Sequence, residues 1–324
     1  MADTDFLLIS TLPDDRAFAA SAAESAGLTL ITATTAKEGA AIIAQKEPRV
    51  IFLDASSEAQ YKEFETAIQE AVGLFSDKIN ANAIHFLTSS NIEKVQYLIQ
   101  SPLFGHFIMR NYHDPVATGR YYGKILKATL SDRAFGLKTL LPNAKVQIVK
   151  LQKTTQKQDA VEAVKNFFIA AKFQSRMATV IANAVDELLM NAMFDAPVDE
   201  VGRPLFNSMV RTTPMALVGR QSIEMHVGYD GQYAAITAVD LFGSLDKVKL
   251  LTHIAKIYTE EEYKIRTSVA GAGIGLATVF RSGGSFFFVS ESGVRTEVTV
   301  FFRRTDNFRE FKDQFRFLST QFYF

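Results

Sequence analysis

Cysteine is absent from the 324 residues of the chain. This absence excludes disulfides, thiolate metal sites and cysteine nucleophiles, and it fits a reducing compartment. The chain also lacks an excess of charge, with 35 basic and 35 acidic residues, so no overall field attracts nucleic acid or an anionic membrane. No apolar run approaches the roughly 20 residues that span a bilayer, and the first residues are acidic where a signal peptide is basic. A cytoplasmic protein without a membrane span is expected.

The first third of the chain alternates short apolar runs with amphipathic helical patterns. The apolar runs read DFLLIS, LTLITA, RVIFLDA, AIHFLTS and HFIMRN. Strands that alternate with helices predict an α/β domain with a parallel, doubly wound sheet of the flavodoxin-like type. This domain is expected to cover 1–130, with any site at the carboxyl ends of its strands.

The rest of the chain divides into three segments. Residues 131–145 show no clear hydrophobic periodicity of a helix or strand and contain Pro142 and Asn143, so they are predicted to be a linker. From 146 to 305, one strand precedes two long helical patterns and further strands follow, which predicts an α+β two-layer domain. The segment 306–324 predicts an amphipathic helix that either packs on its own domain or docks a partner or second subunit. Its apolar residues at helical spacing are Phe308, Phe311, Phe315, Leu318 and Phe322.

A glycine-rich stretch, SVAGAGIGLATVF, begins at Ser268 and leads into a helical pattern. Glycine backbone and the N–H groups of the following helix can close on a phosphate. The spacing is G-x-G-x-G, whereas dinucleotide-binding domains need G-x-G-x-x-G after a strand, and the preceding segment is too charged for that strand. A dinucleotide site and a purely structural loop remain alternatives to a nucleotide-phosphate loop.

Two further stretches favour a nucleotide. In VDELLMNAM, Glu187 and Asn191 are four residues apart, so they project from the same face of the predicted helix. A carboxylate and an amide on an otherwise apolar helix cost free energy unless they serve a function. In AAITAVDLFG, Asp240 ends an apolar strand, where its carboxylate can accept a hydrogen bond from an exocyclic amine such as adenine N6.

Together, DELLMNA, AVDLFG and GAGIGL resemble, in this order, the N, G1 and G2 boxes of the histidine-kinase-like (GHKL, Bergerat-fold) ATPases. The strand and two helices before the N box, and GVRTEV near the end, are most similar to the anti-sigma-factor serine kinases. The resemblance implies bound ATP and Mg²⁺, with Glu187 as general base and Asn191 as the Mg²⁺ ligand. It also assigns to the nucleotide Asp240, Gly243, Thr296, the glycines Gly271, Gly273 and Gly275, and the lid residues Lys264 and Arg266.

The first domain resembles the receiver domains of response regulators. RVIFLDAS puts Asp54 at the end of the third strand, and HFLTS puts Thr88 at the end of the fourth. These are the places of the phosphoaccepting aspartate and the switch threonine, which makes Asp54 a candidate phosphoacceptor. Receivers hold Mg²⁺ with an acidic pair just after the first strand, but here Asp14 and Asp15 come later, at the predicted start of a helix, and Arg110 stands where a lysine is usual. The interpretation is a pseudo-receiver, a signalling or dimerising platform.

The resemblance implies a Mg-ATP-dependent serine/threonine protein kinase, or a nucleotide-dependent partner switch of anti-sigma-factor type, controlled by the receiver-like domain. Its partner would be an anti-anti-sigma, sigma-factor or response-regulator protein, and a homodimer is compatible with the sequence. Two alternatives stay open: a degenerate, non-catalytic ATPase domain, and a split histidine kinase with a separate phosphoacceptor protein. Autophosphorylation on histidine is not expected, because only His113 has an adjacent acid and Pro115 follows it closely.

Overall fold

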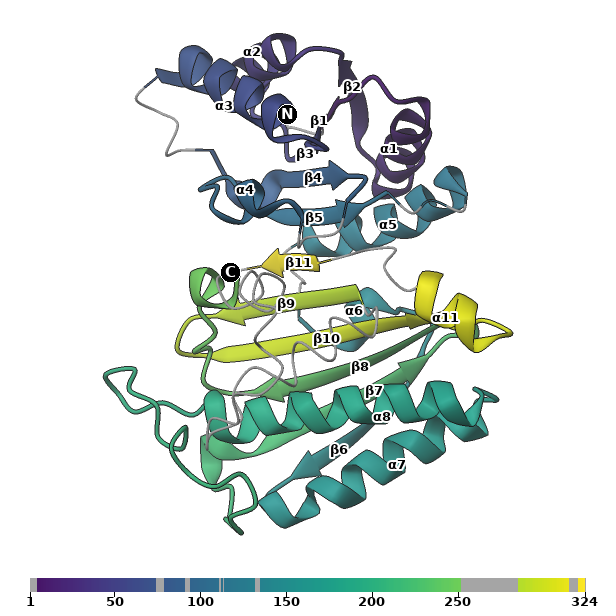
Figure 1. The fold of residues 1–324 in the computed structure, drawn as a ribbon, viewed down its shortest axis with the longest axis vertical. Helices are drawn as coiled ribbons and strands as arrows, with labels where there is room; N and C mark the ends of the chain where they lie inside the picture. Colours follow the sequence, from purple (N-terminus) through teal and green to yellow (C-terminus); the bar gives the residue numbers. More distant parts are fainter. Residues whose placement is uncertain are drawn as a thin grey trace. The chain divides into compact units, whose positions relative to one another are not determined.

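The computed structural model describes residues 5–73, 79–90, 94–110, 112, 114–131, 135–251, 285–314 and 320–323. The chain forms two compact units (Figure 1). Unit 1 comprises Met1–Ala134 and Phe317–Phe322, and unit 2 comprises Phe135–Arg316 and Tyr323–Phe324. One unit contains a parallel sheet and the other an antiparallel sheet, which confirms an α/β protein.

Unit 1 is built on a parallel sheet with the strand order β2-β1-β3-β4-β5. All five strands lie within the apolar runs predicted to form them. The order reverses between β1 and β3, and ligands of such sheets bind beside this switch point at the carboxyl ends of the strands. The strands are β1 (Asp5–Ile9), β2 (Thr29–Ala33), β3 (Val50–Asp54), β4 (Ile84–Thr88) and β5 (His106–Met109).

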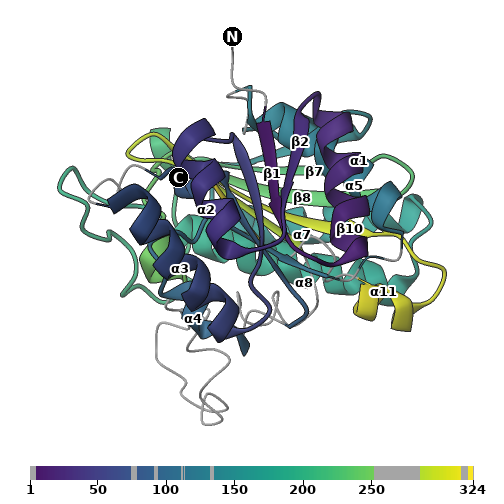
Figure 2. The same ribbon diagram turned by 90° about the horizontal axis from the view of Figure 1, so that it is seen from above.

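Helices cover both faces of this sheet. Figure 2 shows α1 (Pro13–Ala26) and α5 (Pro115–Thr129) on one side of the strands, and α2 (Ala36–Lys46) and α3 (Glu58–Val72) on the other. A short helix, α4 (Gln96–Ile99), precedes β5. Asp114 caps α5 by accepting hydrogen bonds from the backbone N–H groups of Val116 and Ala117, and a proline at the first helical position suits this start.

Glycines allow α1 and α5 to pack closely. A Cβ atom at Gly119 would lie 2.2 Å from the carbonyl oxygen of Phe18, and one at Gly123 would lie 2.3 Å from that of Ala22. Any larger residue would therefore push the helices apart.

The C-terminal segment differs from the sequence prediction. The helix α11 spans Phe308–Gln314, but the prediction of a helix over 306–324 is wrong for Thr320–Tyr323, which forms a strand. Strand β11 (Thr320–Tyr323) follows and pairs antiparallel with β5 of unit 1. Two influences explain the change: threonine and aromatic residues favour strands, and the edge of β5 offers unpaired backbone groups. Phe311 of α11 is buried against Phe302 of its own unit.

Unit 2 contains an antiparallel sheet with the strand order β9-β10-β8-β7-β6. Helices α7 (Lys157–Ala170) and α8 (Ser175–Met190) lie side by side over it (Figure 1). The expected linker is partly structured, because it holds α6 (Leu137–Leu140), whose two terminal leucines are buried. Among the described residues, no helix is long and apolar enough to cross a membrane. The strands are β6 (Lys145–Leu151), β7 (Ile223–Tyr229), β8 (Tyr233–Asp240), β9 (Ser285–Glu291) and β10 (Arg295–Arg303).

The two faces of this sheet are distinguished by their contacts. The ring of Tyr229 on β7 packs against Phe173, just after α7, with 5.2 Å between the centroids. Residues two apart share a face of a strand, so the strand register places Asp240 of β8 and Thr296 of β10 on this same helix-covered face. The opposite face carries Gly228, whose neighbour is Leu137 of α6.

Candidate functional site

Glu187 and Asn191 lie one turn apart at the end of α8, as the spacing predicted. The backbone N–H of Asn191 donates to the carbonyl of Glu187, and both residues are half-buried. Asn191 also begins a π-helical turn, Asn191–Asp195, in which the N–H of Ala196 donates to the Asn191 carbonyl at 3.0 Å. Turns of this type are rare and are often found at functional sites.

The carboxylate of Glu187 lies among several charged groups. Burial raises its pKa above the usual value, and the neighbouring carboxylate of Asp186 raises it further, while Arg211 and Lys157 oppose the shift. Arg211 is held in place by an ion pair with Asp195 of the π-helical turn, at 3.0 Å. A carboxylate whose pKa is moved toward neutrality is better suited to accept a proton from a hydroxyl group.

Asp240 and Thr296 form a hydrogen-bonded pair across β8 and β10. They are direct neighbours in the strand register, and the Thr296 hydroxyl donates to the Asp240 carboxylate. Only 6% of Asp240 is exposed. Its carboxylate also accepts the backbone N–H groups of Phe242, at 2.9 Å, and Gly243. Burial raises the pKa of Asp240 to about 6, although these hydrogen bonds act in the opposite direction.

The segment after Asp240 packs against the turn that begins at Asn191. The Ser244 hydroxyl donates to the carbonyl oxygen of Ala196 at 2.7 Å, and Ala196 is the residue that closes the π-helical turn. Asp240 and Thr296 also lie on the sheet face that α8 covers. The structure therefore places the predicted adenine-reading pair on the face of the sheet that the predicted catalytic helix covers.

Gly243 has a structural requirement of its own. Its φ of +59° is left-handed, and a Cβ atom there would lie 1.9 Å from the carbonyl oxygen of Glu291, the last residue of β9. The residue before it, Phe242, is buried. The guanidinium of Arg220 lies 5.3 Å from the centre of the Phe242 ring and donates to the carbonyls of Leu241, at 2.7 Å, and Gly293, at 2.6 Å.

Arg220 and Arg211 were not predicted from the sequence. Both precede β7 in a long stretch without helical or strand periodicity, which gives no pattern from which their positions follow. The remaining predicted nucleotide residues lie in 252–284, outside the described residues. These are the phosphate-loop glycines Gly271, Gly273 and Gly275 and the lid residues Lys264 and Arg266.

The donor set of unit 2 would suit a Mg²⁺ ion only if phosphate and water oxygens supplied most of its ligands. Within the described ranges, no group of three or more histidine, aspartate or glutamate residues could hold a metal ion. Mg²⁺ does not need such a group when phosphate oxygens and waters fill most of its coordination sphere. The amide of Asn191 could supply the protein oxygen.

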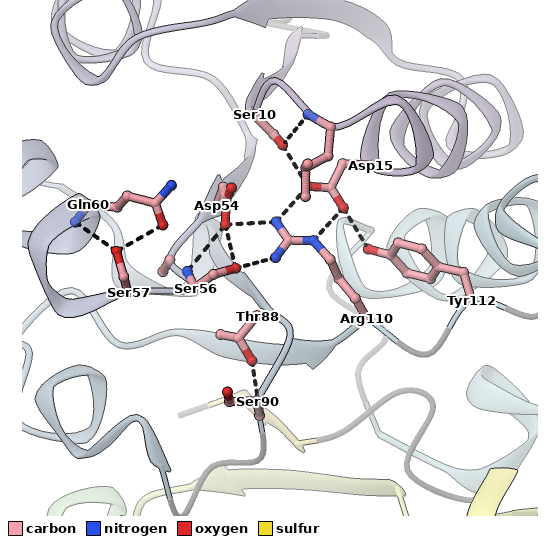
Figure 3. A network of polar contacts seen from close by, with 12 residues as sticks. Ser10, Asp15, Asp54, Ser56, Ser57, Gln60, Thr88, Ser90, Arg110 and Tyr112 are labelled. Atoms are coloured by element: carbon pink, nitrogen blue, oxygen red, sulfur yellow. Dashed lines mark hydrogen bonds and ion pairs between the residues drawn. The ribbon is translucent and has the colours of Figure 1, made fainter.

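A second cluster lies at the carboxyl ends of the strands in unit 1 (Figure 3). The guanidinium of Arg110, just after β5, makes a two-point ion pair with Asp15 in the first turn of α1, with Nε–Oδ1 at 2.7 Å and Nη2–Oδ2 at 2.6 Å. The same Nη2 lies 2.8 Å from Oδ1 of Asp54, at the end of β3. The side chains of Asp15, Arg110 and Asp54 are 0%, 8% and 13% exposed. We call these three residues the Arg110 cluster.

Hydroxyl groups of neighbouring residues form hydrogen bonds with the three residues of the Arg110 cluster. Ser10 donates to Asp15 Oδ2 at 2.6 Å, and Tyr112 donates to Asp15 Oδ1 at 3.3 Å. Ser56 donates to Asp54 Oδ1 at 2.8 Å and accepts from Nη1 of Arg110. Burial, together with the charge of Asp15, raises the pKa of Tyr112, which keeps this hydroxyl protonated as a donor. The Thr88 hydroxyl donates to the Ser90 carbonyl at 2.6 Å.

This arrangement does not fit the Mg²⁺ site of a phosphorylatable receiver. The atom of Arg110 that touches both carboxylates, Nη2, fills the space in which a metal ion would bridge Asp15 and Asp54. Burial lowers the pKa of Arg110, but the hydrogen bonds and charges of the two carboxylates outweigh it and raise the pKa above its usual value. The guanidinium therefore stays charged at every physiological pH.

Comparison with known proteins adds no further assignment. No protein-family model matches the chain, and a search of curated proteins finds no significant match.

Proposed function

We propose that unit 2 is an ATP-binding domain of the Bergerat type, closest to the anti-sigma-factor serine kinases. With Mg²⁺ it would phosphorylate a serine or threonine of a partner protein, or bind that partner in a nucleotide-dependent way. One observation carries the proposal. The buried Asp240–Thr296 pair lies on the sheet face covered by α8, the helix that presents Glu187 and Asn191 one turn apart.

Each residue has a role that its surroundings support. The Asp240 carboxylate would accept a hydrogen bond from adenine N6, and burial strengthens such a bond because the local dielectric is low. Thr296 would assist through a water molecule. Glu187, with its raised pKa, would take the proton of the attacking hydroxyl. Asn191 would hold Mg²⁺, which neutralises charge on the phosphates. Phosphate binding by the three glycines, and by Lys264 and Arg266, stays a prediction.

We further propose that unit 1 is a receiver-like domain that serves as a platform for signalling or dimerisation. The strand order β2-β1-β3-β4-β5 supports the flavodoxin-like fold of receivers. Asp54 and Thr88 end β3 and β4, as the resemblance predicts. The partner of the whole chain would be a protein of the anti-anti-sigma, sigma-factor or response-regulator type.

A non-catalytic role for unit 2 is the second candidate, and the G1 segment favours it. Phe242 is buried beneath Arg220, and the Ser244 hydroxyl donates a hydrogen bond to the Ala196 carbonyl. The ATPases that the chain resembles have small, flexible glycines at these two positions. In this alternative the same surface binds a partner without nucleotide. A split histidine kinase would instead leave acid-labile phosphate on a partner protein.

Titration calorimetry with ATP and Mg²⁺ separates these functions. We expect the wild-type protein to bind ATP and Asp240→Asn to lose at least about tenfold in affinity, since a charged hydrogen bond is worth about 1.5–3 kcal/mol. Glu187→Ala should keep binding but lose phosphoryl transfer to the partner, whereas Glu162→Ala, at an exposed position of α7, should change neither. Absence of ATP binding by the wild-type protein would exclude the kinase, and acid-labile phosphate on the partner would indicate a histidine kinase.

A further inference from the structure

We propose that the guanidinium of Arg110 is a built-in cation that takes the place of a divalent metal ion between Asp15 and Asp54. Unit 1 then neither needs Mg²⁺ nor forms an acyl phosphate on Asp54. The inference concerns unit 1 alone and does not depend on nucleotide binding by unit 2.

The position of the guanidinium is set by three elements of the fold. Asp15 comes from the first turn of α1, Asp54 from the end of β3, and Arg110 from the residue after β5. All three meet at the carboxyl edge of the sheet, beside the point where the strand order reverses (Figure 3). A side chain from the end of β5 reaches this point because β4, which lies between β3 and β5, ends in the smaller Thr88.

The charges of the cluster require a cation. Asp15 is fully buried and Asp54 is nearly so, and two facing carboxylates in such a place are unstable without a positive partner. Arg110 supplies it, with Nε and Nη2 on Asp15, Nη2 also on Asp54, and Nη1 on Ser56. Every nitrogen of the guanidinium is therefore engaged.

A metal ion cannot enter without removing this group. A Mg²⁺ ion binds carboxylate oxygens at about 2.0–2.1 Å, so an ion shared by Asp15 and Asp54 would overlap Nη2, which lies 2.6 Å and 2.8 Å from their oxygens. Displacing Arg110 would break a two-point pair at a buried position, one of the stronger polar contacts in proteins.

The same contacts engage one oxygen of the carboxylate that would act as the nucleophile. Oδ1 of Asp54 accepts from Arg110 Nη2, from the Ser56 hydroxyl at 2.8 Å and from the Ser56 backbone N–H at 3.2 Å. Attack on a phosphoryl donor needs a cation that also binds the phosphoryl oxygens, but the Arg110 nitrogens are already bound within the cluster. The Thr88 hydroxyl is bonded to the Ser90 carbonyl. We therefore expect unit 1 to keep a single conformation whether or not a metal ion or a phosphoryl donor is present.

The first test uses the wild-type chain of 324 residues without nucleotide. Mn²⁺ binding is measured by electron paramagnetic resonance for the wild type and for Asp54→Asn. We expect the two proteins to bind Mn²⁺ equally, because Asp54 does not contribute to a metal site. We also expect no phosphoryl adduct on Asp54 by mass spectrometry after incubation with acetyl phosphate and Mg²⁺. Either a Mn²⁺ signal that Asp54→Asn removes or an adduct on Asp54 would overturn the proposal.

The second test removes the built-in cation. Arg110→Ala should bind Mn²⁺ at least about tenfold more tightly than the wild type, because two facing carboxylates are left without a cation. Mn²⁺ or Mg²⁺ should also raise its thermal unfolding midpoint. Arg120→Ala, which removes an exposed arginine of α5, is the matched control and should gain neither effect. A folded Arg110→Ala without metal affinity would contradict the proposal, and if that variant fails to fold, the wild-type measurements decide.

Discussion

Asp240 and Thr296, from strands far apart in the sequence, lie opposite each other on β8 and β10 and share a hydrogen bond beneath α8. The pKa of Asp240 is raised by burial from 3.8 to about 6. Between pH 3.8 and about 6, the folded protein therefore keeps a proton on Asp240 that the unfolded chain has released. At higher pH Asp240 is ionised in both states, and its buried charge lowers the stability of the folded protein.

Asp240→Asn should thus be more stable than the wild type above pH 7, by about 1–3 kcal/mol, and the advantage should shrink toward pH 5. The asparagine oxygen can still accept the N–H groups of Phe242 and Gly243. Denaturant unfolding of both proteins at pH 8 and pH 5 measures the difference, with the exposed Asp306→Asn as control. A variant less stable than the wild type at pH 8 would show that the carboxylate stabilises the fold.

Gly243→Ala should destabilise unit 2 much more than Gly219→Ala. Both glycines have nearly the same left-handed φ, +59° and +58°, but a Cβ atom would meet the Glu291 carbonyl at 1.9 Å in the first and nothing within 4 Å in the second. Gly219→Ala should lower the free energy of unfolding by about 1–2 kcal/mol because of the backbone conformation alone. Gly243→Ala should lower it by a further ~1–3 kcal/mol because of the clash. Equal losses in denaturant unfolding would mean that the β9–β10 turn moves away freely.

Gly123→Ala tests the close contact between α1 and α5. Alanine favours helices by about 1 kcal/mol over glycine, but its Cβ atom would lie 2.3 Å from the Ala22 carbonyl. We expect a net loss of about 1–3 kcal/mol in the stability of unit 1. Lys124→Ala, at an exposed position of the same helix, should change stability by less than about 0.5 kcal/mol. Stabilisation by Gly123→Ala would contradict the packing described for these helices.

His85 should make unit 1 sensitive to acid. Its ring is fully buried and stacks on His106 with 4.1 Å between the centroids, and Nδ1 donates to the Ala83 carbonyl. Burial lowers the pKa of His85 from 6.5 to about 3. The unfolded chain then binds a proton that the folded protein does not, so stability should fall from pH 6.5 downward, by about 1–2 kcal/mol at pH 5.

Two measurements check this acid sensitivity. In nuclear magnetic resonance, the His85 ring signal, assigned by its loss in His85→Leu, should not titrate between pH 7.5 and 5. The stability of His85→Leu should also fall less steeply with pH than that of the wild type. A His85 signal that titrates near pH 6.5 would rule out the explanation.

The strands of unit 1 could be predicted because each lies in a short apolar run; in β3 (Val50–Asp54) the first four residues are all buried, as expected for a strand covered on both faces. The helical spacing of Glu187 and Asn191 was also predictable from the local sequence, since α8 continues directly into the π-helical turn that begins at Asn191. The resemblance implied that Asp240 and Thr296 serve one nucleotide, but it did not predict that they are direct neighbours, because strand register depends on the whole sheet and not on local sequence.

Three features could not be predicted from local patterns. Arg110 and Asp15 meet only after the strands have been ordered, and nothing in either segment indicates the other. Arg220 lies in a stretch without periodicity. Phe322 continues the helical spacing of the preceding phenylalanines, yet Thr320–Tyr323 forms a strand because the edge of β5 is available for pairing.

The pairing of β11 with β5 also bears on synthesis. Residues 1–134 leave the ribosome long before Thr320–Tyr323 is translated, so during that interval the outer edge of β5 has no strand beside it. An uncovered edge is a site for association between nascent chains. Chaperone demand should therefore be greatest while unit 2 is being made, and it should end when β11 emerges.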